Sequence, residues 1–226
     1  RLGINYFKQL EDELLILKSL GLKLSLCWDI LMTQENYEKK VEAFNKLPLK
    51  LFDSLRVQDP GAMYHALETT DLPIHVICEG GNHNFLALKK YSQVSSQVVR
   101  LVVSYELPAD KISEISKNLD VEIEILGLGR ILLFYTPRYL LSHDQGETQK
   151  KSSEFLEALA TSEESAHKNF PVVENDHGTF MFHNKDFSLI SFGEEKLEST
   201  GIDWLRLETN HLESGDQLMT ALEALK

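Results

Sequence analysis

The sequence has 226 residues, of which 42% are hydrophobic, enough apolar material for one substantial core. Its formal net charge of −12 argues against a broad basic face for nucleic acid. Two cysteines, Cys27 and Cys78, cannot form a disulfide framework, and no stretch resembles a signal peptide or a transmembrane span. We therefore expect one cytoplasmic domain with no membrane contact, and nucleic acid is a disfavoured partner.

Helical and strand patterns alternate through the first part of the chain. Apolar residues recur every three or four positions over 6–20, which predicts a helix that ends at Gly21. Apolar and polar residues then alternate over 22–30, which predicts a strand. Further strands are predicted over 54–58, 74–78, 98–104 and 121–125, and further helices from Thr33, after Pro60, over 85–91 and from Pro108.

Strands separated by single amphipathic helices indicate a parallel sheet. The number of strand–helix units favours a closed (β/α) barrel of the TIM type over an open sheet. The sequence opens at Arg1 with no initiator Met, and a barrel that lacked its first strand–helix unit would have unpaired strand edges. We therefore expect a single α/β barrel domain over 1–226, incomplete at its N-terminus, and a sequence that is a portion of a longer chain.

The regular pattern breaks over 143–169, where polar and charged residues dominate. Only Phe155, Leu156 and Leu159 offer a weak helical face there, and we interpret the segment as an insertion or a mobile lid. Before this segment the sequence predicts a glycine-rich turn at 127–129 and a second apolar run over 131–135. After it we expect short strands over 180–182 and 187–190, a helix over 194–200 and a last strand over 203–208. A final helix follows, with a capping box at Ser214 and Gln217.

Polar residues stand at the C-terminal ends of the predicted strands, where parallel barrels place their active sites. Glu106 and Glu208 are candidate acids or bases, because carboxylates that share a cleft raise one another's pKa. His177 is the third catalytic candidate, because imidazole titrates near neutral pH. The candidate ligand-binding residues are Asp59, Glu79, Asn82, His83, Arg130 and Arg138.

The same residue types also have ordinary structural roles. Strand-end carboxylates cap helices, and Asp59 begins an Asp-Pro-Gly turn. The glycines at 80–81 and at 127 and 129 could admit an anion, but their spacing is not that of a phosphate-binding loop, so close backbone packing is the alternative. No Ser–His–Asp signature and no zinc-protease helix motif is present, so we assign no metal ligands.

Three blocks of the sequence cover 126–142, 170–190 with its Asp176-His-Gly-Thr179 motif, and 201–208, and three upstream blocks cover 57–61, 72–82 and 99–107. In content and order they resemble the collagenase-like protease family, peptidase family U32. The resemblance covers nearly the whole chain. It implies two activities, namely peptide hydrolysis and the oxygen-independent hydroxylation of RNA bases or ubiquinone precursors, the latter sometimes with a related protein as partner subunit.

The chain departs from this family at the cysteines. Family members typically hold a four-iron, four-sulfur cluster with thiolates in the blocks that correspond to 137–142 and 185–190 and in the segment between them. This sequence has Tyr139 and Ser188 at the two places that can be aligned, and it has no cysteine over 143–169. We therefore predict no iron–sulfur cluster and no other cofactor.

Two functions fit these observations, and a third, an RNA-modifying enzyme, is disfavoured by the acidic composition. The first is a divergent family member that binds a small-molecule or peptide ligand, a related partner subunit or a second copy of itself, as the non-catalytic part of a hydroxylation system. The second is a peptidase or hydrolase that uses carboxylates at the barrel mouth. Two further departures from the family pattern weaken the transfer of either function to this chain. Tyr105 precedes Glu106 where the family commonly has Arg, and the last strand keeps Glu208 but loses the Gly and Arg that usually follow. Whether the chain is an enzyme stays open.

Overall fold

The structure is a computed structural model of the whole chain, and it describes residues 7–144, 155–161, 168–189 and 197–208 together with residues 219 and 223. The chain forms two compact units, which are described separately: the first comprises 1–125 and 197–205, and the second comprises 126–196 and 206–226. Strands β5 (Glu122–Thr136) and β9 (Trp204–Leu207) contribute residues to both units. The expected single domain stays a prediction.

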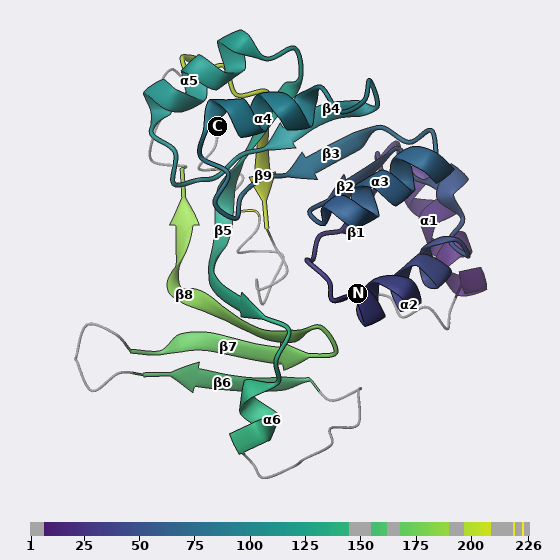
Figure 1. Cartoon of the computed structure of the whole chain (residues 1–226), viewed down its shortest axis with the longest axis vertical. Helices are drawn as coiled ribbons and strands as arrows, with labels where there is room; N and C mark the ends of the chain where they lie inside the picture. The colour runs from purple at the N-terminus through teal and green to yellow at the C-terminus, as the bar shows by residue number, and fades with distance from the viewer. Residues whose placement is uncertain are drawn as a thin grey trace. The chain divides into compact units, whose positions relative to one another are not determined.

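The first unit is a mixed α/β structure on a parallel sheet (Figure 1). Its strands are hydrogen-bonded in the order β1 (Ser25–Trp28), β2 (Ser54–Val57), β3 (Ile74–Ile77), β4 (Val98–Val102) and the beginning of β5. The helices are α1 (Phe7–Ser19), α2 (Gln34–Phe44), the 3-10 helix η2 (Leu49–Leu51), α3 (Pro60–Thr69), α4 (Phe85–Ser92) and α5 (Ala109–Asn118). The predicted alternation of helices and strands in this part of the chain is confirmed.

Short-range signals explain where these helices begin. The side chain of Thr33 accepts a hydrogen bond from the backbone N–H of Asn36 and caps α2, as predicted. Asp59 caps α3 in the same way, at 3.0 Å from the backbone nitrogen of Ala62, and Pro60 occupies the first turn. Each cap satisfies an N–H that has no acceptor within its own helix.

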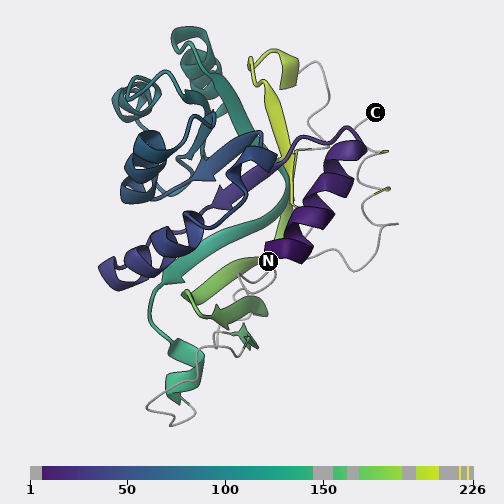
Figure 2. The same cartoon turned by 90° about the vertical axis from the view of Figure 1, so that its right-hand side faces the viewer.

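Alternating side chains give the parallel sheet one apolar face. Leu55, Val57, Ile74, Leu101 and Ile123 have no exposed surface. Helix α3 packs against β2 and α4 against β4, and α3 to α5 lie together on one side of the strands (Figure 2). Burial of these side chains is the main stabilising contribution to the unit. The intervening residues of each strand point to the opposite face of the sheet, where the charged side chains described below are found.

The second unit is built on an antiparallel sheet. The C-terminal part of β5 pairs with β8 (Gly178–Ser188), β8 with β7 (Phe170–Asn175), and β7 with β6 (Leu156–Ala160). The short helix α6 (Leu140–Asp144) follows β5. The last strand was predicted correctly as β9, which pairs with β5, whereas the short strands expected over 180–182 and 187–190 are parts of the single strand β8.

The glycine-rich turn expected at 127–129 is wrong, because β5 runs through it without interruption. Gly129 has a φ of 154°, and a Cβ placed on it would lie 2.7 Å from Cβ of Glu208. Contacts between real Cβ atoms are longer than this. Glycine at position 129 therefore allows the chain at Glu208 to pack closely against β5. This supports close backbone packing, the alternative to anion binding.

The weak helical face at Phe155, Leu156 and Leu159 is also wrong, because Leu156 and Leu159 lie in β6 and Phe155 directly precedes it. Strand β7 supplies the backbone partners for β6, so the strand depends on a neighbour that a local pattern does not contain. The rest of the expected insertion or lid, most of the helix expected over 194–200 and nearly all of the final helix lie outside the described residues. None of the described helices combines the length and the hydropathy needed to span a membrane.

Candidate functional site

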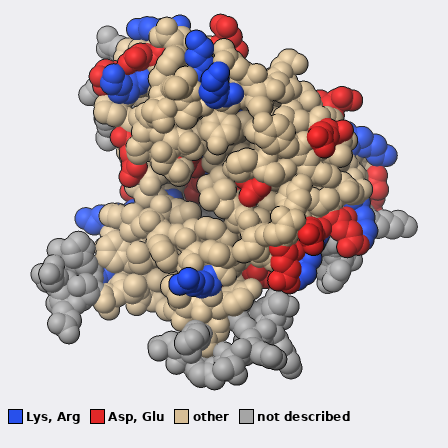
Figure 3. Space-filling model, in the orientation of Figure 1, with Lys and Arg blue, Asp and Glu red and all other residues tan. Residues whose placement is uncertain are grey.

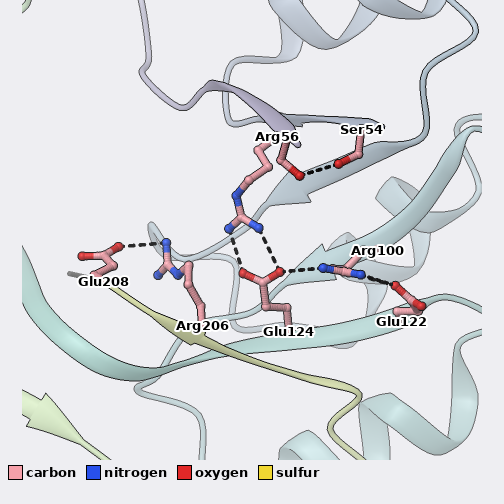
Figure 4. A network of polar contacts seen from close by, with 8 residues as sticks. Ser54, Arg56, Arg100, Glu122, Glu124, Arg206 and Glu208 are labelled. Carbon is pink, nitrogen blue, oxygen red and sulfur yellow. Dashed lines mark hydrogen bonds and ion pairs between the residues drawn. The ribbon is translucent and has the colours of Figure 1, made fainter. Parts of the chain in front are cut away.

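A row of polar residues crosses the inner face of the parallel sheet, the face opposite the helices. Arg56 on β2 is the register partner of His75 on β3, His75 is the partner of Arg100 on β4, and Arg100 is the partner of Glu122 on β5. Glu124 lies two residues further along β5 and points to the same face. Figure 4 shows that the side chains of Arg56, Arg100, Glu122 and Glu124 converge.

These four side chains form one ion-pair network. Both terminal nitrogens of Arg56 lie 2.8 Å from the carboxylate oxygens of Glu124, a bidentate pair. Arg100 lies 3.1 Å from Glu124 and 2.6 Å from Glu122. The Glu124 side chain is only 3% exposed, yet it faces two guanidinium groups. The network contains two positive and two negative charges and is neutral, so it suits a scaffold better than a receptor for a charged ligand.

The pKa values of the network follow from this pairing. Burial by itself would lower the pKa of Arg56, but the hydrogen bonds and charge of Glu124 outweigh it and raise that pKa. Burial would raise the pKa of Glu122, but hydrogen bonds from Arg100 and Trp204 outweigh it and lower that pKa. The guanidinium of Arg100 also lies 4.0 Å from the ring centre of Trp204. The charged forms of Arg56 and Glu122 are thus both favoured at neutral pH.

His75 lies between the two arginines and behaves differently. Burial, followed by the positive charges of Arg100 and Arg56, lowers its pKa to about 4. Its Nδ1 atom is buried and has no hydrogen-bond partner among the described residues. The imidazole is therefore neutral at physiological pH. Sequence reasoning assigned no function to this row and missed its four charged members, although charged residues that alternate with buried apolar residues inside a strand were the available signal.

The structure brings two of the predicted site residues together where β3 and β4 end. His83 Nε2 lies 3.2 Å from a carboxylate oxygen of Glu106 and 3.1 Å from the hydroxyl of Ser104. The same hydroxyl accepts a hydrogen bond from the backbone N–H of Glu106 at 3.2 Å. Ser104 is fully buried, whereas the side chains of His83 and Glu106 are 42% and 59% exposed. We call His83, Ser104 and Glu106 the strand-end cluster.

This cluster is not a nucleophilic triad. In a Ser–His–acid triad the histidine contacts the serine with one ring nitrogen and the carboxylate with the other. Here both partners share Nε2. The arrangement can hold a proton between an imidazole and a carboxylate in contact with solvent, which is the equipment of a general acid or base.

Glu79 and Asn82 precede His83 in the same loop, and both are half-buried. Burial and then the charges of Glu106 and Glu79 raise the pKa of Tyr105, the neighbour of Glu106 in the chain, so Glu79 acts electrostatically on Tyr105. Asp59 has a different role, because it caps α3 and also accepts a hydrogen bond from the backbone N–H of Met32 at 3.2 Å. For Asp59 the structure supports the structural alternative.

In the second unit His177 lies in the tight turn between β7 and β8, where Asn175 pairs with Gly178. Its Nε2 is 3.4 Å from a carboxylate oxygen of Asp176, and its side chain is only 13% exposed. The hydroxyls of Tyr135 and Tyr139 donate to the backbone carbonyls of His177 and Asp176, at 3.0 and 3.3 Å. The turn that carries His177 is therefore held from two sides.

The remaining candidates of the second unit have other neighbours. Glu208 forms an ion pair with Arg206 at 2.9 Å, drawn in Figure 4. Arg130 lies 4.0 Å from Asp186, a long contact between half-exposed groups. The Arg138 side chain is exposed. Of the three catalytic candidates, Glu106 thus belongs to the first unit, with His83, and His177 and Glu208 belong to the second, each with its own partner.

The residues present do not fit a four-thiolate iron–sulfur cluster. The sequence contains two cysteines, of which Cys27 is exposed and Cys78 is buried, and burial raises the pKa of the Cys78 thiol to about 12. Tyr139 donates a hydrogen bond at one cluster position of the family, and Ser188 pairs with Leu128 at another. Within the described ranges no group of three or more His, Cys, Asp or Glu side chains is arranged to hold a metal ion.

Comparison with known protein families gives the class of protein to which this chain belongs. The profile described as Peptidase family U32 matches residues 4–225, and the chain belongs to this family. It is similar to the tRNA hydroxylation protein P2 of Bacillus subtilis (strain 168), with 27% identity over 160 residues that cover 66% of this chain and 49% of the relative. The chain thus spans about half the length of that relative. No solved structure matches the chain.

Proposed function

We propose that this chain is a U32 subunit of an oxygen-independent system that hydroxylates tRNA, in which it binds a ligand or partner and holds no iron–sulfur cluster of its own. The observation that carries the proposal is its similarity to a tRNA hydroxylation protein. The presence of Tyr139 and Ser188 at the alignable cluster positions supports the second part. We also propose that the parallel sheet is part of a TIM-type barrel, since its strands are joined in sequence order through single helices.

The partner that fits best is a related subunit that carries the cluster. A net charge of −12 gives this chain little attraction for RNA. On the face drawn in Figure 3, Lys and Arg side chains of the described residues are interspersed with Asp and Glu and form no continuous basic stripe. Contact with the tRNA backbone and the redox step would then belong to the partner. A second copy of the chain, or a small-molecule or peptide ligand, is the alternative.

The proposal is tested by removing the gene, measuring hydroxylated tRNA nucleosides by mass spectrometry, and purifying the tagged full-length protein without oxygen. We expect the nucleosides to fall, and the protein to copurify with an iron-containing subunit of the same family while holding no iron itself. Unchanged nucleosides would contradict the role in tRNA hydroxylation. Stoichiometric iron in the isolated chain would contradict the cluster-free assignment.

The strand-end cluster favours a second candidate function, a hydrolase. In that case His83 and Glu106 exchange the proton that a hydrolytic step needs, and the peptidase activity implied by the family resemblance would reside in this chain. The test is hydrolysis of a peptide library by the purified protein. Glu106→Gln should abolish any activity, whereas Glu114→Gln, a change in a surface ion pair on α5, should leave it intact. Activity that survives Glu106→Gln would remove this candidate.

A further inference from the structure

Glu174 on β7 is a fully buried carboxylate in the second unit. One of its oxygens accepts hydrogen bonds from the backbone N–H of Leu141 at 2.7 Å and from the hydroxyl of Thr179 at 2.9 Å. The other accepts from the backbone N–H of Ser142 at 3.2 Å. A buried carboxylate is tolerated only when such donors replace water. Glu174 is therefore bound to the start of α6, more than 30 residues away in the chain.

Thr179 on β8 extends the same connection. Its hydroxyl accepts from the backbone N–H of Leu140 at 3.0 Å and lies 2.8 Å from the carbonyl of Arg138. A hydroxyl has a single hydrogen, so it donates either to Glu174 or to Arg138 at any moment. Thr179 is 1% exposed, which keeps water from competing for these bonds.

The backbone of Gly178 approaches Thr136 and Pro137 so closely that no side chain fits between them. A Cβ on Gly178 would lie 2.1 Å from the carbonyl oxygen of Thr136 and 2.7 Å from Cα of Pro137. Both are backbone atoms, which cannot rotate away. Gly178 also has a φ of 120°, in the region that favours glycine. Segment 136–142 is thus in direct contact with residues 174–179 at the turn of the β7–β8 hairpin.

We infer that Glu174 is a positioning residue, whose buried carboxylate holds segment 138–142 on the β7–β8 hairpin and thereby fixes the turn that carries His177. The connection runs from Glu174 to the amides of Leu141 and Ser142, and through Tyr139 in the same segment to the carbonyl of Asp176. The order of this segment then comes from a carboxylate and backbone amides, and it requires no metal.

The test is hydrogen exchange of individual amides in the full-length protein, read by NMR together with the ring signals of His177. Glu174→Gln keeps one acceptor oxygen and turns the other into a donor, so at least one of the two amides, Leu141 or Ser142, loses its acceptor. We expect its exchange to accelerate at least tenfold and the His177 ring signals to shift, while exchange in β2–β4 stays unchanged. The control Glu157→Gln, on the exposed face of β6, should alter neither.

Tyr139→Phe separates positioning from general stability, because it removes only the hydroxyl bonded to Asp176. It should shift the His177 signals and leave the amides of Leu141 and Ser142 protected. A chelator should change nothing in the wild-type protein. The inference fails if both amides remain protected in Glu174→Gln, if exchange rises equally throughout the chain, or if the chelator alone releases these amides. Should Glu174→Gln not fold, Thr179→Val decides through the amide of Leu140, which must then exchange faster.

Discussion

The two units each bury a carboxylate, and they stabilise it in different ways. Glu124 in the parallel sheet is 2% exposed and is neutralised by two guanidinium groups. Glu174 in the antiparallel sheet is 0% exposed and is held by two backbone N–H groups and a hydroxyl. The first arrangement buries compensating charges, whereas the second surrounds one charge with dipoles.

Because their neighbours differ, Glu124 and Glu174 are expected to have different roles. Removing Glu124 leaves the largely buried Arg56 without its carboxylate partner and leaves Arg100 with Glu122 alone. Removing the charge of Glu174 takes an acceptor from three neutral donors, the backbone N–H groups of Leu141 and Ser142 and the hydroxyl of Thr179. An unpaired buried charge costs more than an unpaired buried dipole. The network around Glu124 is therefore expected to govern global stability, and the contacts of Glu174 to govern local position.

The largest expected effect is on Glu124. Glu124→Leu should lower the free energy of unfolding by about 3–5 kcal/mol, because both arginines lose their shared partner. Urea denaturation followed by circular dichroism measures this change. The triple variant Arg56→Met, Arg100→Met, Glu124→Leu removes the three buried charges together, leaves only Glu122, whose side chain is 43% exposed, and should recover most of the loss. A loss below about 1 kcal/mol for Glu124→Leu would show that the network does not govern stability.

The next effect is a dependence of stability on pH that comes from His75. Its pKa is about 4 in the folded protein against an unperturbed 6.5, so between these values the unfolded chain binds a proton that the folded chain does not. Stability should therefore fall as the pH decreases from 6.5 to 4, by up to about 3 kcal/mol.

Denaturation curves of the wild-type protein and of His75→Gln at both pH values isolate this contribution. The subtraction is needed because Glu122, whose pKa is lowered in the folded protein, also loses its stabilising effect as its carboxylate becomes protonated in acid. Equal acid sensitivity in the two proteins would mean that His75 is not the titrating group.

Glu174→Gln should lower the free energy of unfolding by about 2 kcal/mol, less than Glu124→Leu, because the N–H groups of Leu141 and Ser142 and the Thr179 hydroxyl are neutral donors and Gln keeps one acceptor oxygen for them. Thermal and urea denaturation of the two variants, side by side, give the ranking. A larger loss for Glu174→Gln than for Glu124→Leu would contradict the expectation that an unpaired buried charge costs more than an unpaired buried dipole.

The smallest expected effect is at Trp204, whose ring lies 4.0 Å from the guanidinium of Arg100. Trp204→Leu should cost about 1 kcal/mol, because the ring is 44% exposed and the cation keeps its carboxylate partners. Trp204→Phe, which keeps an aromatic face, should lose less. Equal losses in the two variants would indicate that packing or the hydrogen bond to Glu122, which both variants lose, is responsible and not the cation–π contact.

Much of the first unit could be predicted from the sequence because its signals are local. The apolar stripe of α5 at Ile112 and Ile115, the cap at Thr33 and the proline at the start of α3 all act within a few residues. The family could be recognised for a similar reason, since its motifs are contiguous blocks. Of the candidate site, the sequence predicted His83 and Glu106 separately, and the pairing of β3 with β4 brought them together.

The sequence by itself determined the alternation of helices and strands, the family and the lack of four thiolates, because each depends on residue identity or on near neighbours. Only the tertiary structure decided that Arg56 meets Glu124, 68 residues away, that Gly129 makes room for Glu208, and that 156–160 is a strand. These contacts depend on strand register and on partners distant in sequence. Register across a sheet decides which buried charges can meet, and no local pattern contains it.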